Sequence, residues 1–133
     1  MAISQKNLYK ANSDLYQKDN SNLYIMEKIQ EFLDVKNVNQ FKRIRGNFTE
    51  LAYSVKTTRK NSCQILINYL NAYPLFSSKH PDFLDWSKAH QIRIHKKYKT
   101  LEGSSELLLL KNSMNTKRTQ FNWDSLNSFY CLM

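Results

Sequence analysis

Residues 50–56 alternate between polar and apolar side chains, and this is the clearest pattern in the chain. Leu51, Tyr53 and Val55 fall on one side of an extended backbone. A period of two residues predicts a strand with one buried face. The pair Gly46-Asn47 precedes the strand, and such a two-residue connection favours a tight hairpin because Gly takes positive φ without steric cost. The sequence therefore predicts an antiparallel hairpin whose first strand covers residues 38–45.

Four polar side chains are expected to project together from the solvent side of this hairpin. They are Gln40, Lys42, Ser54 and Lys56. Such a face can bind a partner, or it can be solvated and discourage pairing of the sheet edge. The alternation alone leaves both interpretations open.

Two amphipathic helices flank the predicted hairpin. Apolar residues recur at helical spacing over residues 21–33, behind polar residues that can cap a helix. A second helix is expected over residues 62–73, with Asn61 or Ser62 as its cap. Pro74 ends it, because a proline pushes the preceding residue out of the helical region. Helix, hairpin and helix give an α+β fold in which helices cover one face of the sheet.

The C-terminal third reads as a helical extension. A helix is expected over residues 78–95, with Asp82 in its first turn complementing the helix dipole. The basic run at residues 95–99 leads to a second helix over residues 101–114. An aromatic segment at residues 121–123 is expected to pack back on the body.

The N-terminal residues carry little pattern. Residues 1–12 lack periodicity and are expected to form a frayed tail, and residues 13–17 could form a short strand. The chain shows no internal repeat and no linker. Residues 13–133 are therefore expected to form a single domain.

Composition changes the interpretation of the polar hairpin face. The 133 residues include 20 Lys and Arg against 11 Asp and Glu, for a formal net charge of +9 and a pI near 9.6. Such an excess of positive charge on a small chain favours polyanionic partners. A basic ribosomal protein, a DNA-binding protein and a membrane-surface protein would all fit it.

Other classes of site find little support. No apolar run approaches the roughly 18 residues of a membrane span, so no membrane partner is expected. Cys63 and Cys131 are too few for a disulfide framework or a zinc pattern. His90 and His95 are five residues apart and fall on different sides of a helix, so no metal site is predicted. No enzyme emerges from residue spacing alone.

Several segments, in order, resemble the LAGLIDADG homing endonucleases and intron maturases. They are LYQKDNSNLYIMEKIQEFL at 15–33, QILINYLNAYPLFSSKHPDFLDW at 64–86, TLEGSSELLLLKNSMNTKR at 100–118 and FNWDSLN at 121–127. The last three resemble the C-terminal region of that family. The resemblance covers about residues 15–128.

The resemblance implies a fold and a binding surface. The family builds αββαββα halves whose antiparallel sheets form a saddle in the DNA major groove, and the hairpin face away from the helices reads bases and phosphates. Carried over, it makes Gln40, Lys42, Ser54 and Lys56 DNA-facing. Arg43 and Arg45 near the hairpin tip would contact phosphates.

The resemblance also shows a departure. The family's name-giving helix ends in an acid, and two such acids bind the Mg²⁺ that serves phosphodiester hydrolysis. No apolar, glycine-rich helix precedes Asp14 here, so this chain resembles a truncated half that binds no metal alone. Lys60 matches best the family's basic residue near the scissile phosphate, with Lys56 and Arg59 as alternatives.

Three functions remain open at this point. The first is a DNA-binding endonuclease fragment that cannot cleave alone and needs a missing half-domain or second chain. The second is a maturase-like or ribosome-associated protein that binds structured RNA. The third is a relic of an intron reading frame. A bias toward Lys, Asn, Tyr, Leu and Ile, with only two Gly and two Pro, suits an A+T-rich, mitochondrial genome.

Overall fold

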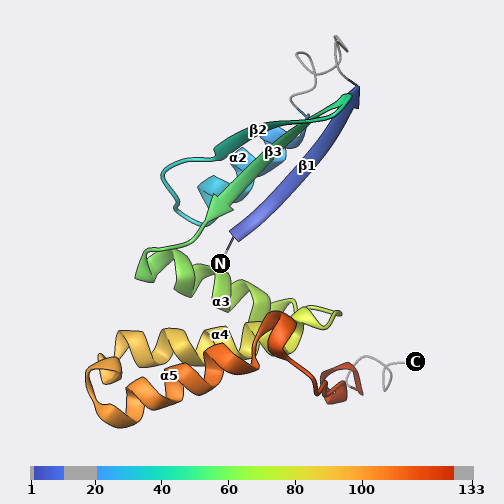
Figure 1. Cartoon of the computed structure of the whole chain (residues 1–133). Coiled ribbons are helices and arrows are strands. Elements are labelled where there is room, and N and C mark those ends of the chain that lie inside the picture. Colours follow the sequence, from blue (N-terminus) through green and yellow to red (C-terminus); the bar gives the residue numbers. More distant parts are fainter. Residues whose placement is uncertain (1, 11–20, 128–133) are drawn as a thin grey trace. The chain divides into compact units, whose positions relative to one another are not determined.

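The computed structural model describes residues 2–10 and 21–127, which divide into two compact units at Leu66 and Ile67 (Figure 1). The first contains a three-stranded sheet and α2, and the second contains α4 and α5, while α3 crosses the boundary. The element bounds are β1 Ala2–Lys10, α2 Ser21–Phe32, β2 Asn39–Arg45, β3 Phe48–Lys56, α3 Lys60–Ala72, α4 Lys79–Ile94 and α5 Leu101–Ser113. Short 3-10 helices are η1 Lys97–Lys99, η2 Asn115–Lys117 and η3 Asp124–Leu126.

The sheet has the order β1-β3-β2, and both pairings are antiparallel. β1 pairs along β3 from Ala2 opposite Lys56 to Lys10 opposite Phe48. The expectation of a frayed tail over residues 1–12 is therefore wrong for residues 2–10. This strand depends on backbone hydrogen bonds to a partner far along the chain, which leave no periodic signal in its own sequence. The short strand expected at residues 13–17 lies outside the described residues.

The core of the first unit lies between α2 and β3. Leu51, Tyr53 and Val55 of β3 are 3%, 3% and 1% exposed. Met26 and Leu33, on and just after α2, are equally buried, and α2 lies against β3 (Figure 1). The predicted helix over residues 21–33 and the predicted hairpin are both confirmed.

Asp34 ties the start of α3 to the end of α2. This residue adopts a left-handed conformation with φ of 51°. Its backbone oxygen accepts a hydrogen bond of 3.0 Å from the Ser62 hydroxyl, and its carboxylate accepts one of 3.3 Å from the Asn61 amide. Because α3 begins at Lys60 and Arg59 accepts its first backbone bond, the predicted cap at Asn61 or Ser62 is wrong.

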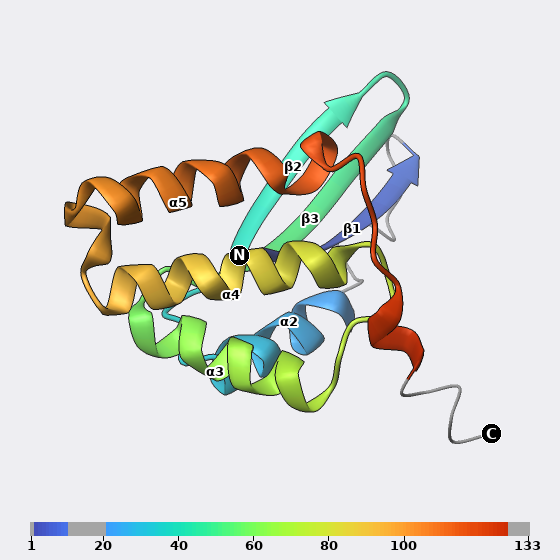
Figure 2. The same cartoon turned by 90° about the horizontal axis from the view of Figure 1, so that it is seen from below.

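In the second unit, α4 and α5 run side by side and are joined by a short turn (Figure 2). Phe83 and Ile92 supply buried apolar contacts from α4. The Thr100 hydroxyl caps α5 by accepting a hydrogen bond of 3.1 Å from the Gly103 N–H. The predicted helices over residues 78–95 and 101–114 are confirmed, whereas a single domain over residues 13–133 stays a prediction.

Across the residues that the structure describes, no helix combines the length and the apolar character needed to span a bilayer. The aromatic segment also differs from expectation. Phe121 and Trp123 stack on each other with ring centroids 6.1 Å apart, and each remains about half exposed. The expected packing on the body gives way to this local stack.

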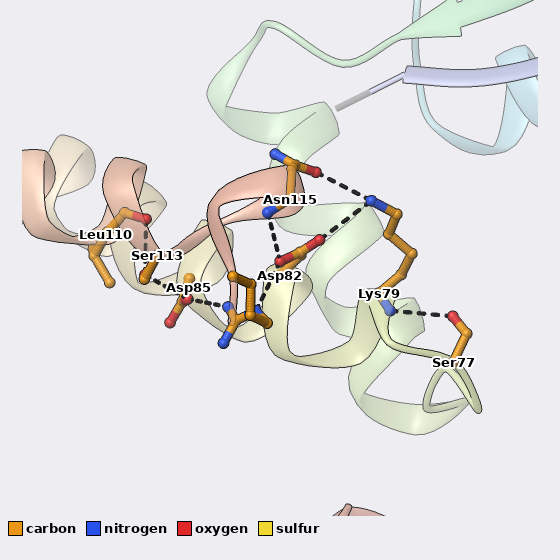
Figure 3. Close-up of polar contacts among 8 residues, drawn as sticks. Ser77, Lys79, Asp82, Asp85, Leu110, Ser113 and Asn115 are labelled. Atoms are coloured by element: carbon orange, nitrogen blue, oxygen red, sulfur yellow. Dashed lines mark hydrogen bonds and ion pairs between the residues drawn. The ribbon is translucent and has the colours of Figure 1, made fainter. Parts of the chain in front are cut away.

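A polar network holds the segment after α5 against the start of α4 (Figure 3). Arg118 lies between two carboxylates, and its Nε donates to Asp82 at 3.1 Å while its Nη2 donates to Asp85. The Asn115 N–H donates to Asp82 at 2.9 Å, and the Ser113 hydroxyl donates to Asp85 at 3.0 Å. The three charged side chains are 14%, 10% and 15% exposed for Arg118, Asp82 and Asp85, so each charge depends on its partners.

The network changes the expected role of Asp82, which sits in the first turn of α4 as the dipole argument required. Burial by itself would raise the pKa of Asp82. Hydrogen bonds from the Asn115 backbone, Arg118 and Lys79 outweigh burial and hold this pKa below its ordinary value. The ionised form therefore stabilises the folded second unit.

We expect Asp82→Asn to lower the free energy of unfolding at pH 7 by about 1.5–3 kcal/mol, because it weakens hydrogen bonds to charged groups. A depressed folded-state pKa gives stability that is complete above the ordinary pKa of 3.8 and is lost as pH falls through the lower folded value. Urea unfolding at a series of pH values should show wild type and variant converging below about pH 3.8. Glu106→Gln, on an exposed position of α5, is the control. A difference that stays constant down to pH 2 would contradict this role.

Candidate nucleic-acid interface

A two-residue turn sets the geometry of the β2–β3 hairpin. Gly46 takes a φ of +58°, and the pairing starts with Arg45 opposite Phe48. A Cβ at Gly46 would meet no neighbouring atom, so the backbone conformation and not space favours glycine here. The turn places two arginines, Arg43 and Arg45, at or near the tip.

The register shows which side chains share a face, since residues directly opposite in an antiparallel pair point to the same side. Gln40 lies opposite Tyr53, and Lys42 lies opposite Leu51. Gln40 and Lys42 therefore belong to the face of the buried apolar residues. The prediction that they project together with Ser54 and Lys56 is wrong. With a two-residue turn at Gly46-Asn47, each even-numbered residue of β2 pairs with an odd-numbered residue of β3. The prediction from sequence instead placed even-numbered residues of both strands on the same face.

The other side of the hairpin is called the open face. From β2 and β3 it carries the residues Asn39, Phe41, Arg43, Arg45, Phe48, Glu50, Ala52, Ser54 and Lys56. A groove beside α2 takes in residues of both faces at the start of β2, since Asn39, Gln40 and Phe41 all line it. The sequence placed Arg43 and Arg45 only near the tip, and the register assigns both to the open face.

An ion pair orders the tip of the open face. The Arg45 Nε lies 3.4 Å from a carboxylate oxygen of Glu50, whose side chain is 7% exposed against 66% for Arg45. Arg43 stands directly opposite Glu50. A buried carboxylate is costly without a cationic neighbour, so Glu50 holds the Arg45 guanidinium while most of the Arg45 side chain stays exposed.

At the other end of the open face, a cation lies over an aromatic ring. The Lys56 Nζ is 5.8 Å from the centroid of the Phe41 ring, and both side chains are exposed. Such a contact keeps the ammonium over the sheet at little energetic cost. The open face thus presents positive charge near both of its ends.

Ser54 lies on the open face, as the sequence predicted, but it is only 5% exposed. Its hydroxyl makes no hydrogen bond within the described ranges. Contact of Ser54 with DNA, as predicted, would require this side chain to become exposed. The exposed residues of the open face are therefore better candidates for contact with DNA.

Lys60 is the first residue of α3 and is exposed. Lys56, at the end of β3, and Arg59 are exposed as well, which brings three cations to the β3–α3 junction. Neither Arg59 nor Lys60 forms an ion pair in the part of the chain that the structure describes. The geometry does not distinguish Lys60 from Lys56 and Arg59 as the basic residue expected near the scissile phosphate.

The carboxylates of the described residues do not assemble into a metal site. Within residues 2–10 and 21–127, no group of three His, Cys, Asp or Glu side chains could hold an ion together. Asp82 and Asp85 are bound to Arg118, and Glu50 is paired with Arg45. The described residues thus do not fit the Mg²⁺ that the family resemblance implies.

Comparison with known sequences identifies relatives over much of the chain. A family model described as LAGLIDADG endonuclease matches residues 2–90. Intron-encoded DNA endonuclease aI3 of Saccharomyces cerevisiae is 35% identical over 92% of this chain and 32% of that protein. Probable intron-encoded DNA endonuclease aI1 of Mycosarcoma maydis is 42% identical over 50% of this chain and 55% of that protein. The chain spans between a third and about half of the length of these two relatives.

Solved structures share the fold. The meganuclease I-SmaMI, bound to uncleavable DNA, superposes with a TM-score of 0.58 at 26% identity, over 88% of this chain and 35% of that one. The homing endonuclease I-GzeII, in complex with its DNA target, gives 0.60 at 21% identity, over 89% and 36%. With the family model matching more than half of its length, the chain belongs to the LAGLIDADG endonuclease family.

Proposed function

We propose that this chain binds duplex DNA through the open face of the β2–β3 hairpin. The observation that carries the proposal is the placement of Arg43, Arg45 and Lys56 as exposed cations on a sheet whose fold is shared with DNA-bound endonucleases. Phosphate contacts from such residues supply affinity, and contacts to base edges supply specificity. Arginine is suited to both, because its planar group binds phosphate or a guanine edge through two parallel hydrogen bonds.

The register of the hairpin supports unequal parts for the predicted contacts. Arg43, Arg45 and Lys56 stand on the open face, with Arg45 paired to Glu50. Gln40 and Lys42 are exposed at the edge of the sheet but start from its helix side. They are proposed as peripheral contacts only.

We also propose that DNA cleavage requires more than this chain. Metal-dependent hydrolysis needs carboxylates that hold an ion against the scissile phosphate, and the acids near the open face and in α4 are engaged by arginines. Lys60 would stabilise negative charge that develops on the phosphate. A second half-domain, in the same protein or a partner chain, would supply the metal ligands. Fungal intron-encoded relatives support a mitochondrial intron as the origin of the reading frame.

Affinity for duplex DNA should fall steeply with salt, because each neutralised phosphate releases condensed counterions. Fluorescence anisotropy with a labelled duplex between 50 and 300 mM salt measures the slope. A slope corresponding to about three or more phosphate contacts is expected. A structured RNA of equal length serves as the comparison. Stronger binding to that RNA at every salt concentration would favour the maturase-like alternative, and a flat profile would refute electrostatic binding.

Arg43→Gln should weaken duplex binding by roughly tenfold and lower the salt slope by about one contact. Lys42→Gln is the matched control, since it removes the same charge from the adjacent residue but from the opposite face. It should weaken binding less than about threefold, which is under 0.7 kcal/mol. Circular dichroism should show both variants folded. Equal effects of the two substitutions would show that the face assignment does not govern binding.

The isolated chain should leave DNA uncut in Mg²⁺ or Mn²⁺, because no metal-binding group of acids has been located among its described residues. The assay incubates pure protein with a long A+T-rich DNA library and sequences any new ends. Lys60→Ala is the companion variant. Defined ends that appear with the wild type and vanish in Lys60→Ala would overturn this part of the proposal.

A further inference from the structure

The second unit has more than half of its Lys and Arg in one short stretch of sequence. Residues 67–133 contain nine Lys and Arg against five Asp and Glu, and residues 88–99 hold five of the nine with no acid among them. The rest of the unit therefore has one acid more than it has bases. The overall excess of Lys and Arg does not explain why these residues are concentrated in this one stretch.

This stretch runs into the turn of residues 95–100 between α4 and α5, called the basic turn. It lies at one end of the helical pair, drawn in orange in Figures 1 and 2. Lys96, Lys97 and Lys99 are all exposed. In the described part of the chain, none of their ammonium groups forms an ion pair with a carboxylate.

Local hydrogen bonds fix the backbone of the basic turn. Lys96 adopts a left-handed conformation with φ of 56°, and the carbonyl of Lys97 accepts bonds of 2.9 Å from the Thr100 N–H and 2.7 Å from the Thr100 hydroxyl. Gly103 packs so closely that a Cβ there would lie 2.1 Å from the Lys97 oxygen. The cations are thus presented from a defined backbone, which lowers the entropy lost when they bind a partner.

The two basic surfaces also differ in how their charges are engaged. On the hairpin, Arg45 is paired with Glu50 and Lys56 lies over Phe41. In the basic turn the three charges are lysines, which act as point charges on flexible stems and suit phosphate oxygens without demanding a fixed geometry. Tyr98, 45% exposed between them, offers a ring on which a sugar or base can stack.

We propose that the basic turn is a second binding surface for the phosphodiester backbone of a nucleic acid. This inference rests on the proposed function only in taking nucleic acid as the polyanion. The concentration of Lys and Arg and the fixed backbone of the basic turn are properties of the second unit alone. It adds contacts that the hairpin does not provide. Duplex DNA and folded RNA share the chemistry that this surface would bind.

The test compares two triple variants of the full chain with the same net charge. Lys96→Gln/Lys97→Gln/Lys99→Gln removes the basic turn's charges, and Lys28→Gln/Lys111→Gln/Lys117→Gln removes three exposed charges elsewhere. The first should weaken binding by about tenfold or more and lower the salt slope by about two to three units. The second should weaken binding less than about threefold and leave the slope unchanged. Unfolding curves should show both variants as stable as wild type.

Separate titrations with duplex DNA, folded RNA and anionic phospholipid vesicles identify the source of the phosphates. A loss confined to the duplex or to the RNA assigns the surface to that nucleic acid. Equal effects of the two triple variants, or a loss seen only with vesicles, would overturn the inference. Combination with Arg43→Gln separates the two surfaces. If Arg43→Gln weakens binding and the basic-turn variant does not, this inference fails and the proposed function stands, and the reverse result refutes only the hairpin.

Discussion

The register of β2 on β3 decides which cations of the hairpin lie on each face of the sheet. Gly46 and Asn47 form the whole connection, so Arg45 must pair with Phe48 and every later pair follows from it. A shift of one residue would move Arg43 to the helix side and bring Lys42 to the open face. The positive φ of Gly46 permits this short turn, which makes one backbone conformation responsible for the charge pattern of a whole sheet face.

Pairing of acids with arginines shapes the remaining electrostatics. Glu50 is paired with Arg45, while Asp82 and Asp85 enclose Arg118, and all three carboxylates are largely shielded from solvent. Buried carboxylates need such partners to remain charged. Because Arg45 and Arg118 are engaged in the same pairs, this pairing leaves the formal net charge of +9 unchanged. It fixes where these acids and arginines stand, while the net charge itself favours polyanionic partners.

The sequence could predict the elements whose pattern of apolar residues lies within the element itself. The helices and β3 carry periodic apolar residues, so their bounds were predicted to within a few residues. β1 pairs with β3 from Ala2 opposite Lys56 to Lys10 opposite Phe48, far along the chain, and nothing within residues 2–10 signals that contact. The hydrogen bonds that Asp34 accepts from the Asn61 and Ser62 side chains, and the Arg118 network that binds Asp82, also join residues far apart in sequence. The wrong assignment of the hairpin face could have been avoided from the sequence alone. A two-residue turn at Gly46-Asn47 already determines which residues of β2 and β3 pair and so share a face.

Two basic surfaces on one chain have a consequence for affinity that neither has alone. Once one surface holds a nucleic acid, the other meets phosphates at an effective concentration set by the chain that joins them, so the combined affinity can exceed either by a factor of about 100 or more. Each neutralised phosphate also adds to the salt dependence. With both proposed surfaces engaged, binding would be tight at low salt and lost over a narrow range of ionic strength. Phosphate contacts would then supply affinity, and contacts from the proposed hairpin face to base edges would supply selectivity.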